Sequence, residues 1–176
     1  MFKKRDEKLV EQALNGNKKA WYMLIARYET AMYQYGIRMT GNSHDAADLM
    51  QEIFISVFRS LTCFKGEGSF KSWLYRIAHC RCVELYRKRK PSVDIDDIQS
   101  PLCDAPCPEM QLSSNRESRA LMQAMQQLPL GQKAVVELKF FGQFTFDEIA
   151  EQMDISANTA KSRLYAALAK LKLELE

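Results

Sequence analysis

The segment 91–112, PSVDIDDIQSPLCDAPCPEMQL, constrains the fold of this chain more than any other. It contains four prolines and five acidic residues, and its apolar residues follow no sustained period. Proline has no backbone N–H and interrupts helices, so this composition favours an irregular or extended backbone. Helical patterns occur on both sides of the segment. We therefore expect two small helical domains, residues 1–90 and 115–176, joined by a flexible acidic linker at 91–114.

Apolar residues recur at three- and four-residue intervals through the first domain, which is the period of an amphipathic helix. The helical stretches are residues 6–35, with a break at NGN, residues 45–61 and residues 70–90. Asn42 or Ser43 can cap the second stretch and Ser69 the third, because their side chains accept hydrogen bonds from free backbone N–H groups. No segment requires a strand. The fold class is therefore predicted to be all-α.

The C-terminal part shows four helical stretches, and the last two lie close together in FDEIAEQMDISANTAKSRL, residues 146–164. Thr145 and Glu148 form a capping box before the third stretch, and Ser156 can cap the fourth after a tight turn. This spacing predicts a helix-turn-helix, whose second helix enters the major groove with its first turns. The residues that this second helix is expected to bury are Ala160, Leu164, Ala167, Leu168 and Leu171. The polar candidates for reading DNA are Ser156, Asn158, Thr159, Lys161, Ser162 and Arg163. The alternative is an ordinary solvated face of a helix pair.

Charge is unevenly distributed along the chain, although the net formal charge is only +3. Residues 1–90 carry 17 Lys and Arg against 9 Asp and Glu, residues 91–128 carry 2 against 6, and residues 129–176 carry 6 against 7. A basic first domain favours a polyanionic partner such as a nucleic acid. The N-terminus is polar and no apolar run approaches the roughly 20 residues of a membrane span. We expect a cytoplasmic protein without direct membrane insertion.

The five cysteines are an odd number without the spacing of a disulfide framework, which agrees with a reducing compartment. The cysteines are expected to be buried and structural. The alternative is zinc binding or redox sensing by His79, Cys80 or Cys82 together with Cys103 and Cys107. On a helix, Cys80 and Cys82 point about 200° apart, so both cannot easily bind one ion. An enzyme is disfavoured because the chain has only two histidines and shows neither a Gly-rich phosphate loop nor a nucleophile–base pattern. We expect no catalytic residue, no metal site and no cofactor.

With both domains in view, the chain apart from its linker resembles a bacterial RNA polymerase sigma factor of the extracytoplasmic-function (ECF) group of the sigma-70 family. The resemblance rests on DAADLMQEIF (45–54), FKGEGSFKSWLYRIAHCRCVELYRKRK (64–90) and LPLGQKAVVELKFFGQFTFDEIAEQMDISANTAKSRLYAALAKL (128–171), in the family's order and spacing. It implies a protein that binds core RNA polymerase, recognises −10 and −35 promoter elements and promotes DNA melting, without covalent chemistry. A helix-turn-helix regulator of the response type is the runner-up, but it leaves residues 45–90 without a role.

The resemblance implies a polymerase contact on the helix that begins at residue 45, which in the family docks on a coiled coil of the β′ subunit. The matching residues are Asp45, Asp48, Gln51, Glu52 and Ile55, an acidic and partly apolar face suited to a basic partner helix. A solvated face is the alternative. Family members commonly carry an acidic residue at the position of Ala47. The β flap of the polymerase is a further expected partner.

The next segment resembles the part of the family that opens and reads the −10 element. Opened DNA exposes bases that stack on aromatic rings while cations hold the backbone, and each stack contributes about 1–3 kcal/mol. The expected contacts are Phe64, Lys65, Lys71, Trp73, Tyr75, Arg76, His79 and Arg87. The Gly-rich loop 64–69 is a candidate for capturing an extruded base, while Phe70 is expected in the core. His79-Cys80 stand where Arg-Asn is common in the family.

By the same resemblance, the predicted recognition helix contacts the −35 element. Arg163 or Lys161 suits guanine or phosphate, and Asn158 suits adenine or a backbone oxygen. The acidic linker would thread through polymerase channels that otherwise hold nucleic acid. The family also implies an anti-sigma partner, often membrane-bound, that clamps the polymerase-facing surfaces.

Overall fold

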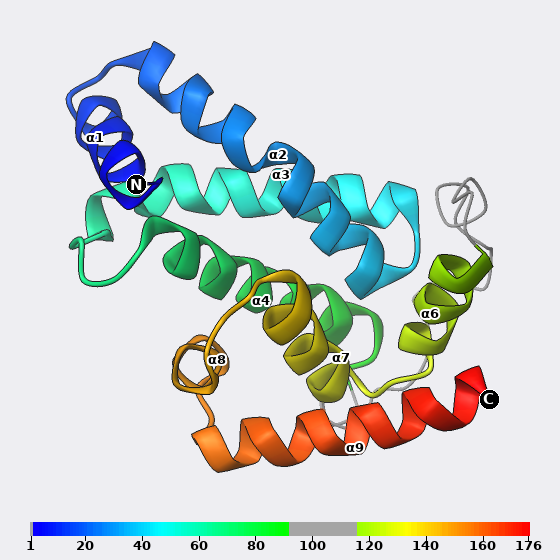
Figure 1. Ribbon diagram of the computed structural model, residues 1–176. Coiled ribbons are helices and arrows are strands. Elements are labelled where there is room, and N and C mark those ends of the chain that lie inside the picture. Colours follow the sequence, from blue (N-terminus) through cyan, green and yellow to red (C-terminus); the bar gives the residue numbers. More distant parts are fainter. Residues whose placement is uncertain (1, 92–115) are drawn as a thin grey trace.

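The computed structural model describes residues 2–91 and 116–176, and every regular element in these two ranges is helical (Figure 1). The first range contains α1 (Phe2–Leu14), α2 (Lys18–Thr40), α3 (Ser43–Ser60), the 3₁₀ turn η1 (Leu61–Cys63) and α4 (Phe70–Arg89). The second contains α6 (Arg116–Gln126), α7 (Leu130–Val136), the π-helical turn η3 (Glu137–Phe141), α8 (Phe146–Met153) and α9 (Ala157–Leu175). The all-α prediction is confirmed. The predicted linker lies, except for Pro91, outside the described residues.

The predicted helix caps are present. Asn42, Ser69 and Ser156 cap α3, α4 and α9, and each side chain accepts a hydrogen bond from the backbone N–H three residues later, at 3.0, 3.1 and 3.0 Å. Thr145 and Glu148 form the capping box of α8, with N–O distances of 3.2 and 2.8 Å. Capping side chains satisfy N–H groups that a helix start leaves unpaired. Local residues therefore determine where these four helices begin.

In the first unit, α3 packs against both α2 and α4 (Figure 1). Helices α2 and α3 approach most closely at Gly36, where a Cβ atom would lie 2.9 Å from Cα of Ala46. The predicted apolar stripe of α3 faces inward, with Ala46, Ile53 and Val57 fully buried. Leu74 of α4 completes this interior and is also fully buried. The exposed face of α3 is thereby turned away from the core.

The second unit is the predicted four-helix arrangement of α6, α7, α8 and α9 (Figure 1). Asp154, in the left-handed conformation with φ of 55°, reverses the chain between α8 and α9 and completes the helix-turn-helix. The predicted core residues of α9 that are buried are Ala160, Leu164, Ala167 and Leu171. Leu168, which was expected in this core, is instead 38% exposed. It lies one position beyond Ala167, which rotates it about 100° away from the buried stripe.

The two units pack against each other and share one apolar core. Leu74 and Tyr75 of α4 belong to the same buried cluster as Phe144, which precedes α8. The ring centroids of Tyr75 and Phe144 are 5.1 Å apart in an edge-to-face contact. The sequence suggests a separate core for each half, because helical periodicity shows that a face is buried but not which unit covers it.

Charged groups are buried where the units meet. Glu137 is 0% exposed and accepts hydrogen bonds from Nε of Arg38 at 2.6 Å and from its Nη2 at 2.8 Å. Lys133 is 1% exposed, and its Nζ donates to Oε1 of Gln126 at 3.0 Å and to the carbonyl of Met39 at 3.3 Å. Burial raises the pKa of Glu137 against the effect of Arg38, and burial lowers the pKa of Lys133 to about 8. Because Arg38 and Met39 belong to α2, polar contacts also hold the second unit on the first.

Candidate nucleic-acid interface

The outer face of α3 carries four of the five predicted polymerase contacts. Asp48, Gln51 and Glu52 are exposed, and Ile55 is 43% exposed. Sequence reasoning missed Phe58, which follows Ile55 by three positions on the same face and is 64% exposed. The signal that identifies Phe58 is a large apolar residue three positions after Ile55 and directly before the cation Arg59. The face is acidic at its start and apolar toward the end of α3.

Asp45 does not lie on this exposed face, contrary to the prediction. It is 5% exposed, and its carboxylate accepts hydrogen bonds from Nη1 and Nη2 of Arg89 at 2.9 and 2.5 Å. A bidentate guanidinium–carboxylate pair is among the stronger side-chain interactions. Asp45 therefore joins the start of α3 to the end of α4 and is not available to a partner in this arrangement.

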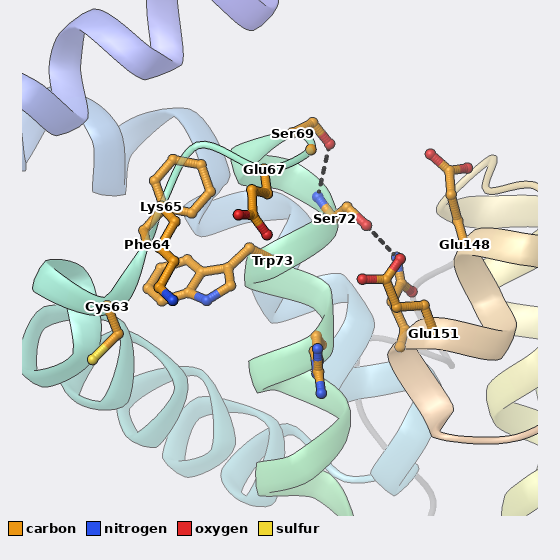
Figure 2. A pocket seen from close by; sticks show the side chains of 12 residues that line it. Cys63, Phe64, Lys65, Glu67, Ser69, Ser72, Trp73, Glu148 and Glu151 are labelled. Atoms are coloured by element: carbon orange, nitrogen blue, oxygen red, sulfur yellow. Dashed lines mark hydrogen bonds between the residues drawn. The ribbon is translucent and has the colours of Figure 1, made fainter.

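The loop 64–69 and α4 form one wall of a pocket of about 320 Å³ (Figure 2). Four of the predicted −10 contacts line it: Phe64, Lys65, Trp73 and Arg76. Gly66 and Gly68, with φ of 74° and 89°, allow the loop to turn back toward α4. The half-buried rings of Phe64 and Trp73 lie with their centroids 5.3 Å apart. Aromatic faces beside cations are the chemistry that binds unstacked bases.

A second group of predicted −10 contacts, Lys71, Tyr75 and His79, lies on the face of α4 that the second unit covers. Nζ of Lys71 donates to the carbonyl of Gly142 at 2.7 Å and lies 5.0 Å from the ring centroid of Phe144. Tyr75 is 4% exposed, so it is a core residue here and not a surface stacking platform as predicted. The helical spacing of Tyr75 in the sequence does not show whether the face of α4 that carries it is covered by another unit or open to solvent. Arg87 lies near the end of α4 and is exposed.

His79 lies close to the predicted recognition helix. Burial lowers the pKa of His79 to about 4, and the positive charge of Arg163 acts in the same direction. Nδ1 of His79 is buried and has no hydrogen-bond partner among the described residues. Arg163 belongs to the second turn of α9, so the predicted −10 and −35 surfaces face each other in this structure.

The pH dependence of His79 tests this placement. Its pKa in the native chain is below the ordinary value, so the unfolded chain binds a proton more readily between about pH 6.5 and 4. We expect the stability contribution of His79 to be complete above that window and to be lost as pH falls through it. NMR titration of the imidazole should give a pKa near 4, and Arg163→Ala should raise it in part. A native value near 6.5 would contradict the buried position of His79.

The start of α9 presents the predicted −35 contacts on one continuous surface. Exposed side chains belong to Ser156, Asn158, Lys161 and Ser162, and half-buried ones to Thr159 and Arg163. Oγ1 of Thr159 lies 2.8 Å from Oγ of Ser156, and the Ser162 hydroxyl donates to the carbonyl of Thr159 at 3.0 Å. These contacts hold the short side chains in place, while the longer side chains of Asn158 and Lys161 are exposed. The arrangement suits insertion of the first turns into a groove.

The outer face of α9 is unexpectedly apolar beyond its first turns. Tyr165, Leu173 and Leu175 are 68%, 76% and 48% exposed, and Leu168 adds to the same outer surface. Sequence reasoning did not single out Tyr165, Leu173 or Leu175, although each is an apolar residue outside the stripe of buried positions.

The described residues include no group of three or more His, Cys, Asp or Glu side chains that could hold a metal ion. Cys82 is fully buried, which raises the pKa of its thiol to about 12. Cys80, for which burial was also expected, is exposed, because it points away from Cys82 on the helix. Cys103 and Cys107 lie outside the described residues. In the same two ranges, no helix is both long and apolar enough to cross a bilayer.

The fold and the polar surface at the start of α9 define a two-domain, all-helical, DNA-binding class of protein. Comparison with known families identifies the family within this class. Residues 24–91 match Sigma-70 region 2, and residues 118–171 match Sigma-70 region 4. The ECF RNA polymerase sigma-E factor of Haemophilus influenzae is 31% identical over 172 residues, which cover 92% of this chain and 90% of the relative. The ECF RNA polymerase sigma factor SigW of Bacillus subtilis is 29% identical, with 99% of this chain and 97% of the relative covered.

Solved structures share the fold. CnrH in complex with the cytosolic domain of CnrY superposes with a TM-score of 0.72 at 24% identity, covering 97% of each chain. The sigma factor RpoE of Bartonella quintana, in complex with the anti-sigma factor NepR, gives 0.70 at 20% identity, covering 89% of this chain and 97% of that one. The chain belongs to the ECF RNA polymerase sigma factors. It is a transcription initiation factor whose regions 2 and 4 serve promoter recognition, and sigma factors are not catalysts.

Proposed function

We propose that the polymerase docks on the outer face of α3. Asp48 and Glu52 supply negative charge, and Ile55 and Phe58 supply exposed apolar surface. Trp21 of α2 packs beside Phe58, with ring centroids 5.3 Å apart, and supports the aromatic part of the face. Apolar anchors within a charged rim are typical of specific protein interfaces. A basic helix of the polymerase β′ coiled coil is the partner that fits, while the apolar outer face of α9 is the candidate surface for the β flap.

We propose further that residues 1–90 read the −10 element and residues 115–176 the −35 element. In the first domain, the pocket between loop 64–69 and α4 is large enough for a base, with Trp73 and Phe64 for stacking and Lys65 for phosphate. In the second, Asn158, Lys161 and Arg163 project from the first turns of α9. This polar surface at the start of a capped recognition helix is the observation that carries the proposal. Arg87 can extend the −10 contact toward the end of α4.

We also propose that residues 91–114 join the domains along the polymerase and that the protein acts in the cytoplasm. An anti-sigma protein is the regulator that one related structure suggests, because the sigma factor RpoE of Bartonella quintana is in complex with the anti-sigma factor NepR. The exposed apolar residues of α3 and α9 are candidate contacts for such a partner, since contiguous exposed apolar patches mark interaction sites.

In vitro transcription tests the proposed function. The chain is mixed with core RNA polymerase and sheared genomic DNA of its host, and start sites are mapped. We expect start sites that share two upstream elements at fixed spacing. Arg163→Ala should reduce these transcripts roughly fivefold or more, since a base contact of this kind contributes about 1–3 kcal/mol.

Lys170→Ala is the matched control, because it removes the same charge from an exposed position farther along α9. It should lower transcription much less than Arg163→Ala does. If both variants lower it equally, α9 contributes only general attraction to DNA. If no specific transcripts form and the chain does not bind core polymerase, the proposed function is wrong.

A further inference from the structure

We propose that the groove between α3 and α4 binds a small anionic disulfide of the glutathione type, which modifies Cys80. Thiol–disulfide exchange at this site leaves a mixed disulfide on Cys80, and a reducing thiol reverses the modification. The site itself does not depend on the proposed function. The effect of the adduct on transcription rests on the proposed role of the −10 surface.

The groove has the size and the charge of an anion site. Its volume is about 470 Å³, which lies in the roughly 300–1,000 Å³ range of small-molecule sites. Its charged lining residues are Arg59, Arg76 and Arg81, and no Asp or Glu lines it in the part of the chain that the structure describes. Residues 116–176 contribute nothing to the lining, so a ligand can enter without any movement of the second unit.

Two of the three arginines are available to a ligand. Arg59 and Arg76 are exposed, and neither has an ion-pair partner among the described residues. Nη1 of Arg81 lies 2.8 Å from Oε2 of Glu84, so the negative charge one turn after Cys80 is already paired. Guanidinium groups bind carboxylates, and a glutathione-type disulfide carries several of them. The groove therefore attracts such a ligand and repels a cationic one.

Cys80 has cations on its own helix and across the groove. It is exposed on α4, with Arg76 one turn earlier and Arg81 next to it, and Arg59 lines the same groove from α3. A reactive cysteine needs access and positive surroundings, because a nearby positive charge stabilises the attacking thiolate. Cys82 lacks this access, since it is fully buried and burial raises the pKa of its thiol to about 12. Cys80 is therefore the thiol of α4 that can react.

Cys63 lines the same groove but has mixed surroundings, which makes it an internal comparison. It also lines the pocket beside loop 64–69, to which three carboxylates contribute. Trp73 lines both pockets together with Cys63, whereas Cys80 lies seven residues farther along α4, or about 10 Å of helix. A bond between two thiols needs Cα atoms within about 7 Å of each other. A disulfide that joins Cys63 to Cys80 is therefore not the expected product.

The exchange needs no oxidant other than the bound disulfide. The Cys80 thiolate attacks one sulfur of the disulfide, a new S–S bond forms, and the S–S bond of the ligand breaks. The other half of the ligand leaves as a thiolate and takes up the proton that Cys80 released. The adduct lies in the groove that Trp73 and Arg76, two proposed −10 contacts, also line. Its bulk and negative charge then compete with a DNA strand for these two side chains.

Exchange rates of the native and the urea-unfolded chain test the site. The chain carries Cys103→Ser and Cys107→Ser, and mass spectrometry after non-reducing digestion assigns each adduct to one cysteine. The probes are oxidised glutathione, which is anionic, cystamine, which is cationic, and 2-hydroxyethyl disulfide, which is neutral. Relative to the unfolded chain, we expect Cys80 to prefer oxidised glutathione over cystamine by about fivefold or more, and Cys63 to show a smaller preference. Equal preference at the two cysteines would overturn the proposal.

Arg59→Gln separates the groove from the general charge of the chain. It should slow the reaction of Cys80 with oxidised glutathione about two- to fivefold, as for the loss of one exposed ion contact. The reaction with the neutral disulfide should not change. Arg119→Gln is the matched control, because it removes the same charge from an exposed position of α6. If the two variants react with oxidised glutathione at the same rate, the arginines of the groove do not bind the ligand and the proposal is wrong.

Transcription with core polymerase tests the effect of the adduct. A chain with Cys63→Ser, Cys103→Ser and Cys107→Ser is modified at Cys80 by oxidised glutathione, and the same chain with Cys80→Ser is treated identically as a control. We expect the adduct to reduce specific transcripts about fivefold or more, as for the loss of one stacking contact, and a reducing thiol to restore them. Full transcription by the modified chain would overturn the inference, while the proposed function stands. If the unmodified chain gives no specific transcripts, the proposed function is wrong, and the exchange rates still decide whether Cys80 is a modification site.

Discussion

Glu137→Ala is expected to lower the free energy of unfolding by about 3–5 kcal/mol, because it leaves the mostly buried guanidinium of Arg38 without its carboxylate. The exposed fractions of the two side chains are 12% for Arg38 and 0% for Glu137, so water replaces the lost partner only in part. Arg38 also lies 4.0 Å above the ring centroid of Phe141, which keeps it in place after the substitution. Urea denaturation followed by circular dichroism measures the change.

Two further variants test the cause of that loss in the free energy of unfolding. Arg38→Met with Glu137→Leu removes both charges and keeps their volume, and we expect it to recover most of the stability, since apolar replacements of a buried ion pair are often neutral. Glu174→Ala at the exposed end of α9 should change stability by no more than about 0.5 kcal/mol. A loss below about 1 kcal/mol for Glu137→Ala would mean that the pair is solvated and that the two units are not packed in solution.

Gly36→Val is expected to destabilise the first unit by roughly 1–3 kcal/mol, or more if the helices cannot separate slightly. Its Cβ would lie 2.9 Å from Cα of Ala46 and 3.0 Å from the carbonyl oxygen of Ala46, and backbone atoms cannot rotate away as a side chain can. Helices α2 and α3 would have to move apart along the contact that also supports the outer face of α3, the proposed docking surface for the polymerase. We therefore expect weaker binding to core polymerase as well as a lower urea midpoint.

Ala26→Val is the matched control on the same helix, because Ala26 is exposed and the added methyl groups meet solvent. It should cost only the difference in helix propensity, roughly half a kcal/mol. Adding Ala46→Gly to Gly36→Val should recover part of the loss, since it removes the Cβ at 3.0 Å but leaves the Cα at 2.9 Å. Equal stability of the Gly36 and Ala26 variants would contradict the close approach of α2 and α3.

Helix starts and single-face burial could be predicted from the sequence because both are local. The capping box at Thr145 uses a partner three residues away, and Asn42 and Ser69 do the same. The stripe of α3 repeats within each turn, so its inward face is recognisable without knowledge of what covers it. The same reasoning placed the exposed polar residues of α9 correctly on one surface, while their role on DNA remains a proposal.

Partners distant in sequence could not be predicted in this way. Glu137 and Lys133 are charged residues that a sequence pattern assigns to the surface, yet both are buried by groups from α2. Asp45 was assigned to the exposed face of α3 by the resemblance, and its burial could not be foreseen because its partner, Arg89, lies 44 positions away. Tyr75 was expected to meet DNA, whereas its actual neighbour, Phe144, comes from the other unit. In each case an aromatic or charged side chain suits two environments, and only the packing of the units decides between them.

The pairing of Asp45 with Arg89 bears on how firmly the end of α4 is held. Helix α4 ends at Arg89, and the last turn of a helix has carbonyl groups without partners inside the helix. Such a helix end frays unless a tertiary contact holds it. The Arg89 guanidinium pairs with Asp45 in the first turn of α3, so the end of α4 and the start of α3 are ordered together. One ion pair thereby fixes the basic end of α4 relative to the outer face of α3.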